Sequence, residues 1–175
     1  AGACPWGPLR GSEVEAAATA DLFGDNVPLA FQQAYIWTAA DGFTALGHLG
    51  SGNSTGISIS ADGGTVVGSS YDVDGQLRAF RWNEDVLMQS LGEVDEDETN
   101  ATARRVSGDD SVIVGNSNKL MSGVDRPRAF VWTEDLGMQL LSTLGTESSF
   151  AYDVSRDGTI IVGSAQLAPG QNSVA

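Results

Sequence analysis

The sequence predicts an all-β protein built from repeats of four-stranded antiparallel meanders, similar to the blades of a β-propeller. Three observations lead to this prediction. The 175 residues include 22 glycines and are only 18% charged, a composition that favours short strands and tight turns. Several short motifs recur three times in the same order. Each motif has the residue pattern of a strand or a turn. A β-solenoid or a stacked sandwich is the alternative architecture.

The first motif is Ala, an aromatic residue, any residue and Trp, and it contains Trp37, Trp82 and Trp132. These tryptophans lie 45 and 50 residues apart. We expect the three tryptophans in equivalent, mostly buried positions. A Leu-Gly pair follows each motif, as Leu46-Gly47, Leu91-Gly92 and Leu144-Gly145.

The second motif is a Ser-x-Asp turn followed by a β-branched run that ends in glycine. Its aspartates are Asp62, Asp109 and Asp157, spaced 47 and 48 residues apart. Aspartate in such a turn accepts hydrogen bonds from the backbone that follows it, which makes these residues turn formers. The β-branched run is typical of a buried strand. The glycines that end it, Gly68, Gly115 and Gly163, indicate a bend or a close backbone approach.

Together the motifs predict four strands for each repeat. In one repeat these are Gly56–Ser60, Thr65–Ser70, Arg78–Trp82 and Met88–Leu91. Four short strands at a period in the forties are typical of a propeller blade.

Outside the repeats the sequence predicts two terminal segments. We assign residues 1–33 to an N-terminal arm, 34–78, 79–128 and 129–165 to three repeats, and 166–175 to a C-terminal tail. The first segment could form a short helix capped by Ser12 or an extended arm, and the sequence does not decide between them. Cys4 is the only cysteine, so no disulfide forms within the chain. It is a bystander, the end of a lipoprotein processing site or a partner in an interchain disulfide.

These motifs resemble the extracellular repeat family named for its His-Ala-Phe (HAF) signature, found in secreted and cell-surface bacterial proteins. The resemblance covers about residues 34 to 165. The family's leading His is absent, because Gln33, Arg78 and Arg128 hold its position. The resemblance implies a propeller-like fold and an extracellular or cell-surface location, and it implies no particular activity. The Ser-x-Asp-Gly turn is also similar to the Asp-box of sialidase-type propellers, where the turn is structural.

Composition excludes two kinds of partner. The chain has 9 Lys and Arg against 23 Asp and Glu, a net charge of −14 that would repel nucleic acid phosphates. No apolar run approaches the ~20 residues of a membrane-spanning helix.

The sequence offers no catalytic constellation, and we expect no enzyme. His48 is the only histidine, and we expect it in a surface loop. Asp72 and Asp74 alternate before a glycine, as calcium loops often begin, which makes them a weak calcium site. The run Glu93–Glu98 is expected to be a solvated loop or a weak cation site.

Asn53 and Asn100 each begin an Asn-x-Ser/Thr sequence and are candidates for glycosylation in a secreted chain. The alternative is that these asparagines simply open a strand.

The expected function is that of an extracellular structural subunit. The repetitive part begins and ends with half a blade, Ala34–Leu46 and Tyr152–Ser164. Unpaired strand edges favour association with another copy of the chain, as a six-bladed ring or a head-to-tail fibre. One alternative is an adhesin or carbohydrate-binding module that belongs to a larger propeller and binds surface glycans. Another is a sialidase-like or lyase-like enzyme, although no cluster of Arg, Tyr and Glu is evident.

Overall fold

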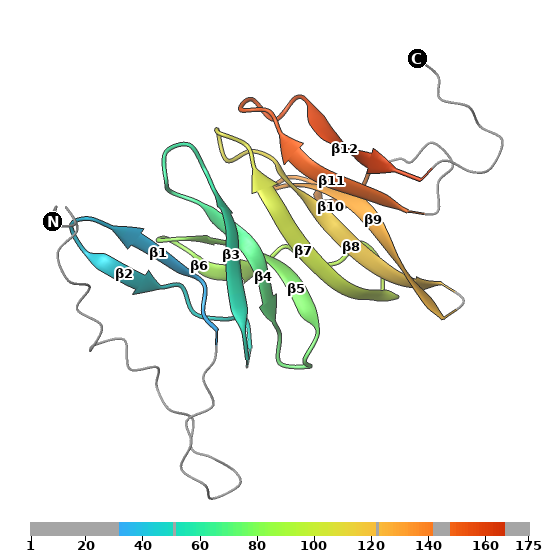
Figure 1. Cartoon of the computed structure of the whole chain (residues 1–175), viewed down its shortest axis with the longest axis horizontal. Helices are drawn as coiled ribbons and strands as arrows, with labels where there is room; N and C mark the ends of the chain where they lie inside the picture. The colour runs from blue at the N-terminus through green and yellow to red at the C-terminus, as the bar shows by residue number, and fades with distance from the viewer. Residues whose placement is uncertain (1–31, 51, 122, 142–147, 167–175) are drawn as a thin grey trace, which may run out of the picture. The chain divides into compact units, whose positions relative to one another are not determined.

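A computed structural model describes residues 32–50, 52–121, 123–141 and 148–166, all within the second of the two parts into which the chain divides, Gln32–Ala175. These residues form strands and turns and no helix, so the all-β prediction is confirmed (Figure 1). The strands are β1 (Tyr35–Thr38), β2 (Gly42–Ala45), β3 (Ser54–Ile59), β4 (Val66–Tyr71), β5 (Leu77–Asn83), β6 (Leu87–Ser90), β7 (Glu98–Val106), β8 (Ile113–Met121), β9 (Val124–Thr133), β10 (Gly137–Leu140), β11 (Ser149–Val154) and β12 (Ile161–Ala165).

The strands pair as two complete meanders and two hairpins, which we call modules. The first module is the hairpin β1–β2, and the fourth is the hairpin β11–β12. The second module pairs β3, β4, β5 and β6 in sequence, and the third pairs β7, β8, β9 and β10. A parallel pairing of Leu77 with Asn100 joins β5 to β7, so the two meanders form one eight-stranded sheet. The pairings of the described strands close no ring.

The modules repeat their hydrogen-bond register as well as their motifs. Val66 pairs with Trp82 across β4 and β5, and Ile113 pairs with Trp132 across β8 and β9. The first strand of a module carries an irregularity at the same place each time, between Gly56 and Ser58, between Ala103 and Arg105, and between Ala151 and Asp153. A repeated bulge of this kind bends the strand in the same way in each module.

The glycine that ends each β-branched run is required by a close backbone contact. A Cβ atom added to Gly68 or Gly163 would lie 1.9 Å from a carbonyl oxygen of the neighbouring first strand, that of Thr55 or Phe150. At Gly115 the corresponding distance, to the Thr102 oxygen, is 2.1 Å. No side chain fits at such distances, so the sequence prediction of a close approach agrees with the structure at all three positions.

The hydrophobic cores lie between successive modules. Trp82 of the second module packs in a cluster with Ala34 and Leu46, which flank β1 and β2. Trp132 of the third module packs in another cluster with Val67 and Ala79 of the second. Both tryptophans are buried, as the sequence predicts. Each module therefore depends on its neighbour for the burial of its tryptophan.

Trp37 differs from this expectation, because 41% of its surface is exposed. It lies on β1, on the strand face opposite to the one that packs against Trp82. The described residues place no module on that outer face. The prediction of three buried tryptophans is therefore wrong for the first of them.

In the first three modules, a leucine after the last strand bonds the alanine of the tryptophan motif. In the third module this leucine is Leu141, whereas the sequence motif contains Leu144. The backbone N–H groups of Leu46 and Leu91 donate to the carbonyls of Ala34 and Ala79 at 2.9 and 3.0 Å. In the third module Leu141 makes the same bond to Ala129, at 2.9 Å. The Leu144-Gly145 pair lies outside the described residues.

Residues at the edges of the predicted segments belong to the fold. The carbonyl of Gln32, a residue of the predicted N-terminal arm, accepts from the N–H of Ser54 at 2.8 Å. Gln166, assigned to the tail, donates its N–H to the carbonyl of Ser148 at 2.9 Å. The rest of both segments, including Cys4 and Ser12, lies outside the described residues. Among the described residues, no helix has the length and apolar character needed to cross a membrane.

Candidate functional site

The Ser-x-Asp turns have the same geometry in three modules. In each, the Ser Oγ donates to the Asp Oδ1 at 2.6 Å, for the pairs Ser60–Asp62, Ser107–Asp109 and Ser155–Asp157. The same Ser Oγ accepts from the backbone N–H five residues later, at 2.9 to 3.0 Å. The residue after each aspartate has a positive φ: 82° at Gly63, 63° at Asp110 and 71° at Gly158. The turn therefore uses both the hydroxyl and the carboxylate of its motif internally.

Hydrogen bonds to the carboxylates keep them charged. The serine hydroxyl is the largest cause that lowers the pKa of Asp62, Asp109 and Asp157, and backbone N–H groups add to it. At Asp157, where the Thr159 hydroxyl donates a further hydrogen bond, the pKa falls to about 2. A proton-transferring carboxylate needs a pKa near the working pH, so these aspartates are suited to holding turns rather than to acid–base chemistry.

The turn serine of the third module should contribute measurably to stability. Ser107 is fully buried, and its Oγ both donates to Asp109 and accepts from the N–H of Val112. We expect Ser107→Ala to lower the free energy of unfolding by about 1–3 kcal/mol, because the part-buried N–H of Val112 loses its acceptor. Urea denaturation measures this loss.

Ser155→Ala is the matched control for that substitution. Ser155 makes the same two hydrogen bonds in the fourth module, but it is only half-buried, and Ile160, which supplies the donor N–H, is 63% exposed. Water can replace the lost acceptor there, so the loss should stay below about 1 kcal/mol. Equal losses for the two variants would contradict this account of the turn.

The candidate calcium ligand Asp72 is occupied by its own loop. Its Oδ1 accepts from the N–H groups of Asp74 and Gln76 at 2.9 Å each, and its Oδ2 pairs with Arg78 Nε at 2.8 Å. Burial alone would raise the pKa of Asp72, but these hydrogen bonds outweigh it and lower the pKa. Asp74 is exposed. The described residues include no group of three or more His, Cys, Asp or Glu that could hold a metal ion.

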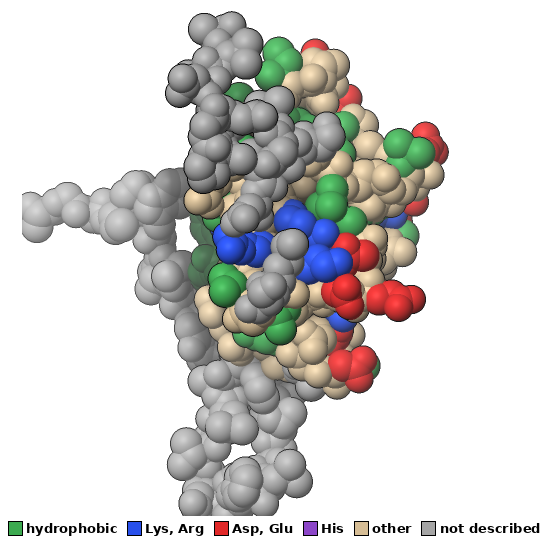
Figure 2. Space-filling model, turned by 90° about the vertical axis from the view of Figure 1, so that its right-hand side faces the viewer, with side chains coloured by type: hydrophobic (Ala, Val, Ile, Leu, Met, Phe, Trp, Pro, Cys, Tyr) green, Lys and Arg blue, Asp and Glu red, His purple; other side chains and the backbone are tan. Residues whose placement is uncertain are grey.

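The acidic run Glu93–Glu98 is not simply a solvated loop. Asp95 pairs with Arg128 at 2.9 Å and with Lys119 at 3.4 Å, and the Arg128 guanidinium is the main cause that lowers the pKa of Asp95. Glu98 is 6% exposed, and this burial raises its pKa. Figure 2 shows Lys and Arg side chains gathered beside Asp and Glu side chains on one face of the molecule.

Sequence reasoning missed these ion pairs, although one signal pointed to them. Arg78 and Arg128 stand directly before the Ala-Phe pair of the second and third tryptophan motifs. Arg78 also bonds Glu93, at 2.6 Å. At both positions, the arginine ties a module's third strand to an acidic loop. The observed role of this position is structural.

The remaining candidate residues lie apart from one another. His48 is exposed, in the segment between β2 and β3. Asn53 is exposed, and its Oδ1 accepts from the N–H of Gln32 at 2.9 Å. Asn100 is half-buried in β7. The structure brings none of these residues together with the repeated aspartates as a catalytic group.

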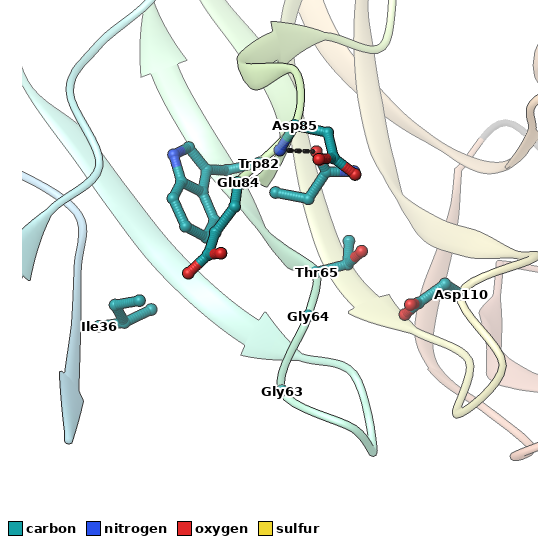
Figure 3. A pocket seen from close by; sticks show the side chains of 9 residues that line it. Ile36, Gly63, Gly64, Thr65, Trp82, Glu84, Asp85 and Asp110 are labelled. Carbon is teal, nitrogen blue, oxygen red and sulfur yellow. Dashed lines mark hydrogen bonds between the residues drawn. The ribbon is translucent and has the colours of Figure 1, made fainter. Parts of the chain in front are cut away.

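Two cavities are open at the surface of the modules. The first, of about 340 Å³, lies beside the Ser-x-Asp turn of the second module. Figure 3 shows the carboxylates of Glu84, Asp85 and Asp110 around it, together with Trp82. Its lining carries no Lys, Arg or His, so it offers no cation to pair with an acidic ligand.

The second cavity, of about 470 Å³, is lined mainly by asparagines, a threonine, an arginine and two aromatic rings. It holds no carboxylate. Its residues come from three successive modules, and they include Asn100 and Thr102 of the Asn-x-Thr sequence.

Neither the protein-family models nor the curated proteins contain a match to this sequence.

Proposed function

We propose that this chain is a non-enzymatic structural subunit of the extracellular space or cell surface. In this proposal its modules are propeller-like blades of the HAF type, and it associates with further copies of itself. The supporting observation concerns the outer faces of the first and fourth modules. Residues on these faces are exposed, whereas the residues at equivalent repeat positions are buried at the junctions between inner modules.

The outer face of the first module corresponds to a face that is buried in the next two modules. Tyr35, Trp37 and Phe43 are 58%, 41% and 46% exposed. The rings of Tyr35 and Phe43 contact each other edge to face, with centroids 4.9 Å apart. By repeat position, Trp37 is equivalent to Trp82 and Trp132, which are buried between modules. An exposed aromatic face of this kind favours a partner.

The outer face of the fourth module corresponds to the face that, in the second and third modules, packs against the module that follows. Val162 is 54% exposed, whereas the equivalent Val67 and Val114 are fully buried. Ile160, on the same side of the hairpin, is 63% exposed. In the inner junctions, residues of this side pack against the following module.

The inner modules also indicate how two outer faces would meet. Because β4 pairs with β5 as Val66 with Trp82 and Gly68 with Phe80, the equivalent register pairs Ile161 with Trp37 of a second copy. Val162 then lies opposite Ile36 of that copy. Pairing of this kind completes a four-stranded module across the two chains and satisfies the backbone groups of two strand edges. Such head-to-tail contacts produce a ring if they close and a fibre if they do not.

The oligomeric mass tests the proposal. We expect the average mass of the intact chain in sedimentation equilibrium to rise with concentration. Val162→Asp should raise the dissociation constant at least tenfold, because a carboxylate would be desolvated at the junction. Leu136→Asp is the matched control, since Leu136 is 71% exposed in the turn between β9 and β10. It should associate like the unchanged chain.

A chain that stays monomeric at all concentrations would overturn the proposal. That outcome would favour the alternative of a module within a larger propeller. Equal weakening by Val162→Asp and Leu136→Asp would place the contact elsewhere on the surface and would also contradict it.

A further inference from the structure

The second cavity lies over a polar face of the third module. It is an open groove lined by residues of β4, β5, β7, β8, β9 and β11: Tyr71, Leu77, Asn100, Thr102, Arg104, Asn116, Asn118, Pro127 and Phe150. It is separate from the two outer faces described above. What it binds is therefore independent of whether the chain associates with itself.

The floor of the groove is a square of four polar side chains on two paired strands. Asn100 of β7 lies opposite Asn118 of β8, and Thr102 lies opposite Asn116. Directly opposed side chains on one sheet face have Cβ atoms about 5 Å apart. A single small ligand can therefore contact two or more of them.

One corner of this floor is held rigidly. Asn116 is 6% exposed; its Oδ1 accepts from Arg104 Nε at 2.9 Å, and its Nδ2 donates to the carbonyl of Ser149 at 3.3 Å. These bonds fix the amide orientation and position the Arg104 guanidinium along the groove. The terminal guanidinium nitrogens of Arg104 make no hydrogen bond to another described residue.

The rest of the floor has unused hydrogen-bonding groups. The side chains of Asn100, Thr102 and Asn118 form no hydrogen bond with any other described residue. An amide offers two donors and an acceptor, and a hydroxyl offers both functions. The groove thus presents donors and acceptors close together, without a net negative charge.

Two aromatic rings also line the groove. Tyr71, at the end of β4, is 38% exposed. Phe150 of β11 is half-buried, and its ring stacks on that of Tyr152 with centroids 6.1 Å apart and an angle of 12°. The two rings come from the second and fourth modules. A ligand that contacts both rings would therefore bridge these two modules.

We propose that this groove binds a neutral saccharide. Sugar rings have apolar C–H faces that pack on aromatic rings, and hydroxyl groups that both donate to and accept from amide side chains. A few placed polar groups between apolar walls are the usual construction of a small-ligand site. Nucleic acid is disfavoured by the net charge of −14, and a metal ion by the lack of carboxylates in the lining.

Saturation-transfer difference NMR on the intact chain, produced without N-glycosylation, tests this site. The probes are four neutral hexasaccharides: maltohexaose, cellohexaose, xylohexaose and chitohexaose. We expect at least one to receive saturation from the protein. Asn118→Leu should weaken its binding about tenfold, because sugar hydroxyls lose an amide partner in a partly desolvated site. Tyr71→Ala, which removes an exposed ring, should also weaken the binding of this hexasaccharide. It serves as the test variant if Asn118→Leu does not fold.

Gln139→Leu is the matched control, since it replaces an exposed amide on β10 away from the groove. It should bind like the unchanged chain. Three results would overturn the proposal: no signal from any hexasaccharide, unchanged binding by both groove variants, or equal loss in Gln139→Leu. Saturation of an oligothymidylate probe instead of the sugars would overturn it as well.

Discussion

Replacing Trp132 with Ala should lower the free energy of unfolding by about 3–5 kcal/mol, as expected for truncation of a buried tryptophan. The Trp132 side chain is 7% exposed and packs in a core cluster with residues of the second module. The Arg81 guanidinium carbon lies 4.6 Å from the centre of its ring, which adds a cation–π contact between the modules. Arg81 also pairs with Glu134, close to Trp132 in the chain. Urea denaturation followed by circular dichroism measures the loss.

Trp37→Ala is the internal comparison for that result. Trp37 has the same place in the repeat, but 41% of its surface is exposed. Much less apolar area returns to water when it is truncated, so its loss should be less than half that of Trp132→Ala. Similar losses at the two positions, measured below any concentration at which the chain associates, would show that Trp37 is buried in the monomer and contradict this fold.

Gly115→Ala should be as damaging, although it adds only one methyl group. The new Cβ would lie 2.1 Å from the Thr102 oxygen and 2.7 Å from Phe130 Cζ. Phe130 is fully buried in the core and the Thr102 carbonyl belongs to a paired strand, so neither can move freely. We expect a loss of about 3 kcal/mol or more, since overpacking a rigid site forces backbone shifts. Thermal denaturation shows the effect as a large fall in Tm.

Gly56→Ala is the control for the added methyl group. A Cβ at Gly56 would have its nearest neighbour, a Val66 methyl, at 3.4 Å, which is ordinary contact. Its backbone also lies outside the left-handed region that favours glycine. The stability should change by less than about 1 kcal/mol. A tolerated Gly115→Ala would mean that the strands are further apart than the structure places them.

The parts of the fold that sequence reasoning predicted are those that depend on local chemistry. The Ser-x-Asp turn needs only residues within six positions of one another, and all three copies form as expected. The β-branched runs and the glycines after them also agree with the observed strands. A motif seen three times at fixed spacing removes much of the ambiguity of a short apolar run.

The parts that could not be predicted depend on contacts between distant segments. Trp37 has the same local sequence pattern as Trp82, and its exposure depends on which module lies beside it. Glu98 belongs to an acidic run that the sequence predicts to be solvated, yet Glu98 is buried. In the same run, Asp95 pairs with Arg128, which is distant in the sequence. The saccharide groove gathers side chains as far apart in sequence as Tyr71 and Phe150. No short motif contains that information.

The single residue pair that links β5 to β7 has a consequence for how such a chain can lengthen. Leu77 and Asn100 provide the only strand pairing between the two described meanders, and further contacts at their junction are made by side chains. In repeat architectures each copy interacts chiefly with its immediate neighbours. Duplication or loss of one whole copy, cut at equivalent points, would preserve the ladder of every other copy. The number of repeats can thus change by whole copies while the hydrogen-bond register within each copy stays the same.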